Sequence, residues 1–322
     1  MSEIVSFNLS WATQKNIVAG SERNFVLNCH KHFGKKLVKD TGLPMCTNMG
    51  AQGIHKNTNF DITGLQECIK DVTPKFIEYL NNLKENEGKN DGKMMGKLKN
   101  EGKNDRKSGR KSNRKSDKKN SKKNSHYEYI VTSVDIANLI TVYRKSFGEA
   151  IIMKKGNLSH EKDLRPFHVI YFPKLKLLFA NSHFPHGLLL DEYDKIFDRI
   201  FNFELGNKKV NRIIFAGDFN DGYGYLADRG YIDITLNVGN IGNGNSTKTF
   251  HLTCNNLKNV ESCCYIFFSI SGDYIFDSES SNKLKIVKNF TKNINEAKEN
   301  ENKFVGSDHL PVISKTRKKL MI

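Results

Sequence analysis

The chain carries, at residues 212–220, the stretch RIIFAGDFN. Residues 212–216 form a mainly apolar run with the length of a buried strand. Gly217 then allows the backbone to turn, because glycine has access to conformations that other residues avoid. We therefore expect Asp218 and Asn220 at the carboxyl end of a buried strand, where they point into a cleft.

A second polar motif lies near the end of the sequence, where residues 307–312 read SDHLPV. It places Asp308 next to His309 at the edge of another apolar run. The histidine ring is the side chain that titrates near neutral pH, and a neighbouring carboxylate can bind a metal or accept a proton. The two motifs together predict a hydrolase that acts on phosphate esters.

Four more polar residues stand at the ends of strand-like runs. In chain order these are Asn8 in the run 4–8, Glu67 after the run 60–66, His183 after the run 175–182, and Asp273 at the start of the run 273–276. The run before Glu67 is interpreted as a strand that ends in a turn into a helix. Each candidate therefore lies at a strand end, where a site can form.

In this order the motifs resemble the endonuclease/exonuclease/phosphatase superfamily, which includes the DNase I-like and abasic-site nucleases. The matching positions are Asn8, Glu67, Asn181-x-His183, 217–220, 273–276 and 307–309. They span nearly the whole chain apart from a basic segment in the middle. The resemblance implies an α/β fold of four layers, in which two mixed β-sheets pack face to face with helices outside. One such domain is expected over residues 1–322.

The resemblance also implies a metal-dependent phosphoesterase. Glu67 is expected to bind the metal ion, Asn8 to support the same ion, and Asp308 to complete the site or hold water to it. Oxygen donors of this kind suit Mg²⁺ or Mn²⁺ better than Zn²⁺.

The catalytic roles follow from the same resemblance. His309 would take or share a proton while Asp273 orients its ring, and Asp218 would position or deprotonate the attacking water. Asn220 and His183 would hold phosphate oxygens. Whether the histidine or the aspartate is the general base stays open.

Two further residues are assigned supporting roles. Glu149 falls where some nuclease relatives carry a glutamate that pairs with the second histidine. Asn181 belongs to the same motif as His183.

The sequence departs from two subfamilies. Abasic-site nucleases carry an aspartate two positions after the first asparagine, whereas Asn8 is followed by Leu9 and Ser10. Inositol-polyphosphate phosphatases are expected to carry an aromatic-arginine pair after the second asparagine, whereas residues 221–223 read DGY. Both subfamilies are therefore disfavoured.

Residues 84–125 form a basic low-complexity insert built from short repeats. They hold about +10 of the formal net charge of +16, and they contain too few apolar residues to offset the entropy of ordering, so we expect disorder. One interpretation is a polybasic arm that binds nucleic acid through phosphates, or a nuclear address. The other is a spacer that arose by repeat expansion.

Two other segments carry a structural signal. Residues 189–204 have apolar side chains at helical spacing and predict an outer helix packed on a sheet. Residues 237–246 are rich in Gly and Asn and predict a flexible loop beside the cleft.

Composition narrows the cellular setting. The six cysteines have no regular spacing and do not form a disulfide framework, and the chain has no leader-like start and no apolar run that could cross a bilayer. We expect an intracellular, unsecreted protein of the cytoplasm or nucleus that acts as a monomer.

Three functions remain open at this point. The first is a nuclease or nucleotide phosphodiesterase, with nucleic acid as the substrate. The second is a phosphatase or phospholipase C-type enzyme that acts on a small phosphomonoester or lipid headgroup. The third is a non-catalytic scaffold that binds nucleic acid. The sequence decides neither DNA against RNA nor endonuclease against exonuclease.

Overall fold

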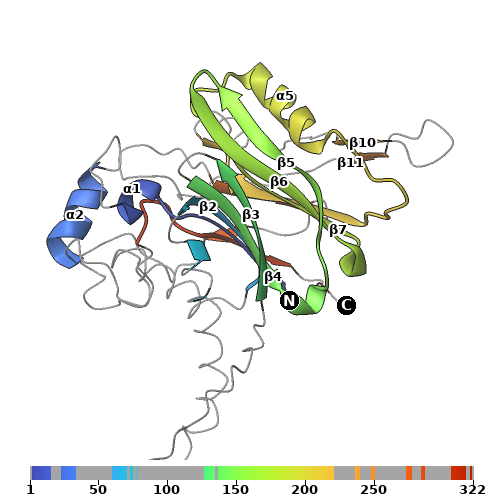
Figure 1. Cartoon of the computed structure of the whole chain (residues 1–322), viewed down its shortest axis with the longest axis horizontal. Coiled ribbons are helices and arrows are strands. Elements are labelled where there is room, and N and C mark those ends of the chain that lie inside the picture. The colour runs from blue at the N-terminus through green and yellow to red at the C-terminus, as the bar shows by residue number, and fades with distance from the viewer. Residues whose placement is uncertain are drawn as a thin grey trace, which may run out of the picture.

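The computed structural model in Figure 1 describes residues 2–15, 23–33, 60–70, 127–134 and 137–220. It also describes shorter segments at 73–74, 78, 236–239, 248–250, 273–277, 284–286, 306–316 and 320.

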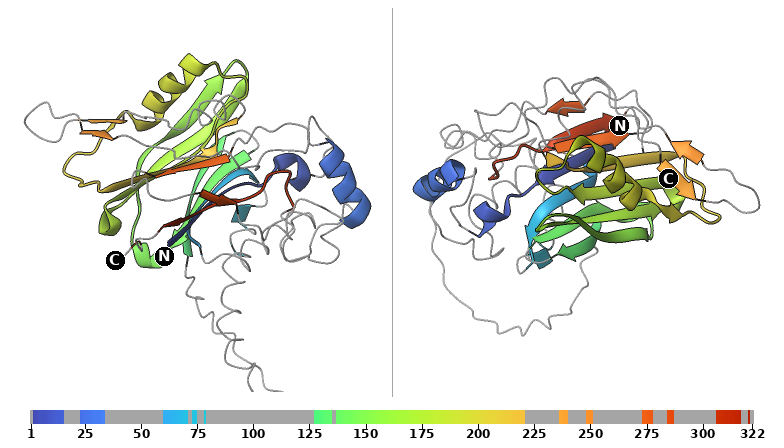
Figure 2. Two further views of the ribbon diagram at one scale, coloured as in Figure 1. Left: turned by 180° about the vertical axis from the view of Figure 1, so that it is seen from behind. Right: turned by 90° about the horizontal axis from the view of Figure 1, so that it is seen from above.

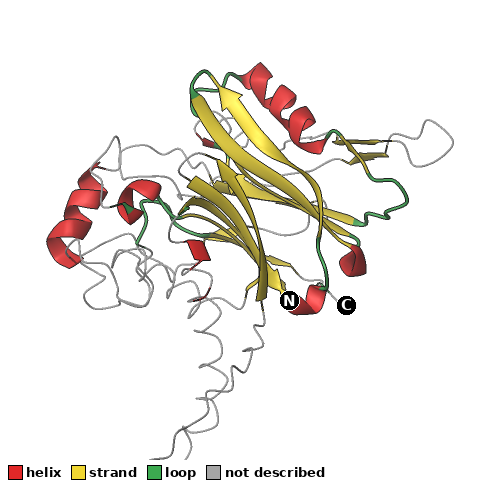
Figure 3. Cartoon of the chain, viewed as in Figure 1, coloured by secondary structure: helices red, strands yellow, loops and turns green. Residues whose placement is uncertain are grey.

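Most of the described chain forms two β-sheets (Figure 3). The six-stranded sheet has the order β13 (Leu284–Ile286), β14 (Val312–Thr316), β1 (Ser2–Asn8), β2 (Phe60–Ile69), β4 (Ala137–Arg144) and β3 (Tyr127–Val134). The five-stranded sheet has the order β12 (Asp273–Asp277), β9 (Arg212–Asp218), β7 (Leu177–His183), β6 (Asp163–Phe172) and β5 (Ile151–His160). A third, small sheet contains β11 (Lys248–Phe250), β10 (Leu236–Gly239) and β8 (Phe203–Glu204).

Both large sheets are mixed. The pair β1 and β2 and the pair β7 and β9 run parallel, and the other neighbours in these sheets run antiparallel. The sheets pack face to face, with β1 and β2 against β9 and β7 (Figure 2). The arrangement confirms the predicted two-sheet sandwich.

Helix α5 (Leu190–Phe201) covers the outer face of the five-stranded sheet (Figure 1). Its apolar side packs inward, where Phe197 and Phe201 contact Phe215 of β9 edge to face. Such ring pairs add to the stabilisation from burial alone. The outer helix predicted at 189–204 is therefore confirmed, with slightly shorter bounds.

Two helices lie at one end of the six-stranded sheet, α1 (Trp11–Gln14) and α2 (Arg23–Phe33) (Figure 1). Two short 3₁₀ turns, η2 (Lys145–Phe147) and η3 (Pro173–Leu175), connect strands. No helix in the described part of the chain is long and apolar enough to span a membrane.

Several sequence predictions fall outside the described residues. The basic insert 84–125 is one of them. The segment predicted as a loop at 237–246 begins instead as strand β10, which pairs with β8 and β11, and its remainder is not described. Strand pairing overrides the weak strand preference of Gly and Asn there.

A buried histidine lies between the two sheets. His168 of β6 is fully buried, and its ring nitrogens are 3.0 Å from Thr132 Oγ1 and 2.6 Å from Thr141 Oγ1. Burial, and secondarily the charge of Lys155, lower the pKa of His168 to about 3. The ring is therefore neutral at any pH above that value, and its two hydrogen bonds need no charge.

We expect His168 to make folding sensitive to mild acid. Because its pKa is depressed in the folded state, its contribution is fully present above pH 6.5 and is lost as the pH falls from 6.5 toward 3. At pH 5 the cost is about 2 kcal/mol. Urea unfolding of wild type and His168→Gln at pH 7.5 and pH 5 measures it. The difference in unfolding free energy between wild type and His168→Gln should shrink at pH 5 by about that amount. Equal losses of unfolding free energy in both proteins would contradict this assignment.

Candidate active site

The carboxyl ends of the two parallel strand pairs meet at one end of the sandwich. Asn8 of β1 and Glu67 of β2 come from one sheet, and His183 of β7 and Asp218 of β9 come from the other. His183 and Asp218 are direct partners in register. Asn8 joins the sheets, because its Nδ2 donates a hydrogen bond of 2.8 Å to Asp218 Oδ2.

Polar groups surround the Asp218 carboxylate. Besides Asn8, the backbone N–H of Asn220 donates to its Oδ1 at 3.0 Å. The Nε2 atoms of His183 and His309 lie 3.7 and 3.9 Å from its Oδ2. Burial raises the pKa of Asp218, but the two histidines and the two hydrogen bonds outweigh burial and lower the pKa to about 2. Asp218 is therefore an ionised hydrogen-bond acceptor at neutral pH.

Glu67 lies inside strand β2 rather than after it, which corrects the predicted turn into a helix. The pairing of β2 with β4 shifts register between Leu65 and Cys68, and Glu67 has a positive φ of 56° at this bulge. The Gln14 side chain forms hydrogen bonds with the backbone of this bulge. Its Nε2 donates to Glu67 O at 2.8 Å, and its Oε1 accepts from Ile69 N at 3.1 Å. A bulge of this kind re-aims one side chain, here a carboxylate toward the opposite sheet.

Three groups lie close to the Glu67 carboxylate. Trp11 N donates to Oε2 at 2.9 Å, Arg165 Nη1 lies 3.4 Å from Oε1, and His183 Nε2 lies 3.7 Å from Oε1. Burial raises the pKa of Glu67, and the charge of Arg165 acts in the opposite direction.

Two other residues with positive φ flank the cluster around Asp218 and Glu67. They are Ser10 at 54° and Asn220 at 56°. Left-handed backbone is uncommon outside glycine and gathers at functional sites, where the surrounding structure holds it in place. At Ser10 the support is a hydrogen bond from its N–H to Asn8 Oδ1 at 2.8 Å.

Asn220 ties the loop after β9 to the loop after β7. Its Nδ2 donates to Phe184 O, and Phe184 N donates to Asp218 O at 2.8 Å. The side chain therefore positions backbone in this structure. Its predicted contact with a phosphate oxygen stays a prediction.

The motif at residues 307–309 is hydrogen-bonded to the end of strand β1. Ser307 Oγ donates to the carbonyl oxygen of Asn8 at 2.8 Å and accepts from His309 N at 3.1 Å. This turn brings Asp308 and His309 to the cluster, with His309 Nε2 at 3.9 Å from Asp308 Oδ1. The predicted association of these residues with Asn8 and Asp218 is found.

Asp273 and Glu149 differ from the other predicted residues. The backbone of Asp273 lies directly opposite Asp218 in the β9–β12 ladder, and its side chain is not described. Glu149 does not join the site: it is exposed just before β5, close enough to Tyr143 to help raise the pKa of that phenol after burial and Glu128. Glu149 lies at the opposite end of β6 from the cluster. The next strand residue, Ile151, pairs with Tyr171 near one end of β6, whereas Arg165, near the other end, contacts Glu67.

Asn181 stands between the sheets rather than in the pocket. Its Nδ2 donates to Ile140 O at 3.0 Å and to Thr141 Oγ1 at 3.2 Å, and its Oδ1 accepts from Gln66 Nε2 at 2.8 Å. It therefore supports the site by fixing the spacing of the sheets. Gly64 makes room for it, since a Cβ at position 64 would lie 2.9 Å from Asn181 Oδ1.

We expect Gly64→Ala to destabilise the protein by about 1 to 3 kcal/mol, because the added methyl group overpacks this contact. Asn181→Ala also destabilises by removing buried hydrogen bonds, but it creates the space that the methyl needs. The double variant should therefore lose less than the sum of the two single losses. Urea unfolding of the four proteins measures the coupling, and strict additivity would contradict the clash.

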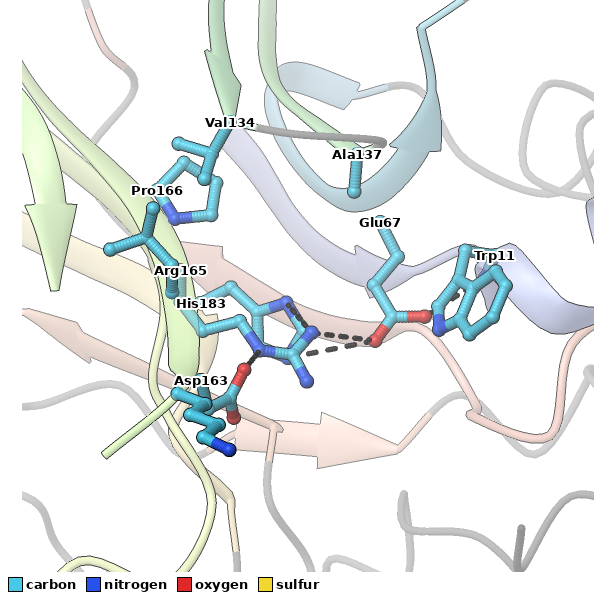
Figure 4. Close-up of a pocket in the computed structure, with 10 residues that line it drawn as sticks. Trp11, Glu67, Val134, Ala137, Asp163, Arg165, Pro166 and His183 are labelled. Atoms are coloured by element: carbon cyan, nitrogen blue, oxygen red, sulfur yellow. Dashed lines mark hydrogen bonds and ion pairs between the residues drawn. The ribbon is translucent and has the colours of Figure 1, made fainter. Parts of the chain in front are cut away.

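A pocket of about 220 Å³ opens beside Glu67 and His183 (Figure 4). Its walls come from the start of α1, the adjoining ends of β3 and β4, and the start of β6. The lining residues are Trp11, Glu67, Val134, Ala137, Lys162, Asp163, Leu164, Arg165, Pro166 and His183.

Arg165 is the main site residue that the sequence analysis missed. Its Nε donates to Asp163 Oδ1 at 2.6 Å, and its Nη1 reaches both Glu67 and, at 3.3 Å, His183 Nδ1. Asp163 in turn accepts from His186 N at 2.9 Å through Oδ2. The available signal was a charged residue between two apolar ones in a strand, which is common on sheet surfaces.

Arg165 decides the tautomer of His183. A guanidinium only donates, so Nδ1 accepts and the proton of the neutral ring lies on Nε2. Burial and then Arg165 lower the pKa of His183 well below its usual value. The buried Nε2 has no hydrogen-bond partner among the described residues and faces the gap between Glu67 and Asp218. The ring is therefore poised to donate to a group that enters this gap.

Comparisons with known proteins identify similar folds. No family model matches the chain, and no curated protein matches it in sequence. In fold, this chain is similar to endonuclease/exonuclease/phosphatase proteins. A protein of that name from Bacteroides vulgatus shares 11% identity at a TM-score of 0.47, covering 97% of both chains.

Two further solved structures are similar over a comparable span. ANGEL2, described as a 2',3'-cyclic phosphatase, shares 13% identity at a TM-score of 0.45, covering 97% of this chain and 94% of its own. D. rerio TDP2, complexed with a single strand DNA product, shares 13% at a TM-score of 0.42, covering 97% of both chains.

Proposed function

We propose that this chain is a metal-dependent phosphoesterase that hydrolyses phosphodiester bonds in nucleic acids or nucleotides with activated water. The observation that carries the proposal is the buried cluster of Asp218, His183 and His309, in which His183 also lines the pocket that contains Arg165. A carboxylate beside two imidazoles can orient and deprotonate water, and a guanidinium suits a phosphate oxygen.

The residues of the cluster fit a divalent cation. Three carboxylates are buried there: Glu67 is 7% exposed, Asp218 1% and Asp308 0%. Arg165 is shared with Asp163, so its charge offsets these carboxylates only in part. Buried negative charge without full compensation is costly, and a bound cation would relieve it.

Glu67 and Asp308 would hold the ion, with the second lone pair of Asn8 Oδ1 as a neutral donor. In the described part of the chain, no three His, Cys, Asp or Glu side chains stand ready to ligate a metal. The two carboxylates and the amide oxygen suit Mg²⁺, which keeps several waters and takes one or two carboxylates. When bound, the ion would act as a Lewis acid on a phosphoryl oxygen and lower the pKa of a water.

The chain's own residues supply the remaining steps. Asp218 and His309 form the acid–base pair that orients the attacking water and handles its proton. His183 donates from Nε2 to a phosphoryl oxygen, and Arg165 offsets the charge that builds up there. Asn8 and Asn220 keep the Asp218 carboxylate fixed during these steps.

We expect Asp218→Asn and His309→Ala to lower kcat by about 100-fold or more, since acid–base groups contribute that much. Wild type and both variants are assayed with Mg²⁺ on plasmid DNA, single-stranded RNA, bis-p-nitrophenyl phosphate, inositol phosphates and sphingomyelin. Circular dichroism verifies that the variants fold. His160→Gln is the matched control, because His160 pairs with Glu192 outside the cluster.

The panel distinguishes the proposed substrates. Nucleic-acid cleavage that both variants lose supports the proposal. Turnover confined to inositol phosphates or sphingomyelin would assign a headgroup substrate instead. Full activity of Asp218→Asn, or equal activity in excess chelator, would refute the mechanism.

The metal site has a test that needs no substrate. Mg²⁺ should raise the melting temperature, because a ligand that binds only the folded state stabilises it by about 2.7 kcal/mol at 100 times its Kd. The shift should shrink in the double variant Glu67→Gln/Asp308→Asn. NaCl at equal ionic strength is the control, and an identical shift in both proteins would place the ion elsewhere.

A further inference from the structure

The pocket beside the cluster has two chemically different parts. One end is polar and adjoins the centre through Glu67, Arg165 and His183. The apolar lining side chains, which we call the apolar wall, are Trp11 beside Glu67 and, elsewhere around the pocket, Val134, Ala137, Leu164 and Pro166. Hydrolysis of a phosphate ester requires the polar end alone, so the apolar wall calls for a different explanation.

Trp11 is the main component of the apolar wall. It is the only tryptophan of the chain, and its side chain is partly exposed at the pocket (Figure 4). Its backbone N–H donates to Glu67 Oε2 at 2.9 Å, and its carbonyl accepts from Lys15 N at 2.9 Å in the turn of α1. The ring is therefore attached to a backbone that is fixed against a carboxylate of the centre.

Positive charge also lines the pocket. Arg165 and Lys162 both line it, and Asp163 fixes the guanidinium by its 2.6 Å hydrogen bond. A ligand that satisfies both parts carries an anionic group at Arg165 and a flat apolar group at Trp11. A nucleotide has this combination, because its base presents a π-face and its phosphate is an anion.

We propose that the apolar wall is a subsite for one nucleobase, held against Trp11, while the phosphate attached to its sugar points toward Arg165 and His183. This inference rests on the proposed function and specifies the substrate as a nucleotide unit. Trp11 acts as the residue that recognises the group next to the scissile bond.

The dimensions and chemistry of the pocket support a single ring system. At about 220 Å³ it is smaller than the 300–1,000 Å³ of pockets that hold drug-sized ligands. The side chains of Val134, Ala137, Leu164 and Pro166 offer no hydrogen-bonding groups. Recognition by stacking tolerates any base, so we expect weak base preference at this subsite.

The single tryptophan makes occupancy directly measurable. Asp218→Asn in Mg²⁺ is titrated with AMP, CMP, ribose 5-phosphate and inorganic phosphate while tryptophan fluorescence is recorded. AMP and CMP should change the emission saturably, and ribose 5-phosphate should bind at least about 5-fold more weakly because it has no base to stack. Equal binding of AMP and ribose 5-phosphate would overturn the subsite, and so would no response to any nucleotide.

Substitution of the ring separates stacking from a structural role. Calorimetry should show that Trp11→Leu binds AMP roughly 5- to 150-fold more weakly, whereas Trp11→Phe retains most of the affinity. Inorganic phosphate should bind both variants as it binds wild type. The hydrogen bond to Glu67 uses the backbone of Trp11, so it remains in both. Tyr129→Leu, which removes an exposed ring on the edge strand β3, is the matched control and should bind like wild type.

These measurements separate the two hypotheses. Selective AMP binding in a protein that cleaves no phosphodiester would keep the subsite and refute the proposed function. Cleavage of nucleic acid with unchanged AMP affinity in Trp11→Leu would keep the proposed function and refute the subsite.

Discussion

The hydrogen bond from Asn8 to Asp218 joins the two sheets at the centre of the site. It is buried and connects residues from β1 and β9, the strands that contact each other across the sandwich. Because one end is ionised, this bond is stronger than one between neutral groups. His183 and His309 lie beside Asp218, and Glu67 lies next to His183.

Charge balance explains the contacts that surround the buried carboxylates. Burial raises the free energy of each ionised carboxylate, so each needs donors or cations nearby. For Glu67 these are Trp11 N and Arg165, and for Asp218 they are Asn8, Asn220 N and the two histidines. The bulge at Glu67 and the left-handed backbone at Ser10 and Asn220 are the local distortions that aim these groups.

The sequence was informative where chemistry is carried by short motifs. Asn8, Glu67, His183, Asp218, Asp308 and His309 were all expected at one site, and the structure brings them together. Strand ends marked by a polar residue after an apolar run are visible in one dimension, because the strand period and the terminating residue are both local.

Other features depend on contacts that no local pattern encodes. Arg165 and Trp11 reach the site only because the start of β6 and the start of α1 lie beside it. The place of Glu149 in the sequence predicts a supporting role at the site, but the residue lies at the far end of β6 from the cluster. The turn expected after Glu67 is a bulge within β2, since pairing with β4 resumes at Cys68 and extends the strand.

The site has a further consequence for how the protein acquires its final structure. Strand β1 lies between β14 and β2, and Ser307 reaches back to the carbonyl of Asn8 across 299 positions of sequence. A contact of such high sequence separation carries a large loop-closure entropy, and topologies rich in them fold slowly. A nascent chain therefore cannot complete this constellation until strand β14 has been synthesised and has paired with β1. The cluster can therefore form only after residues 307–316 are available to pair with β1.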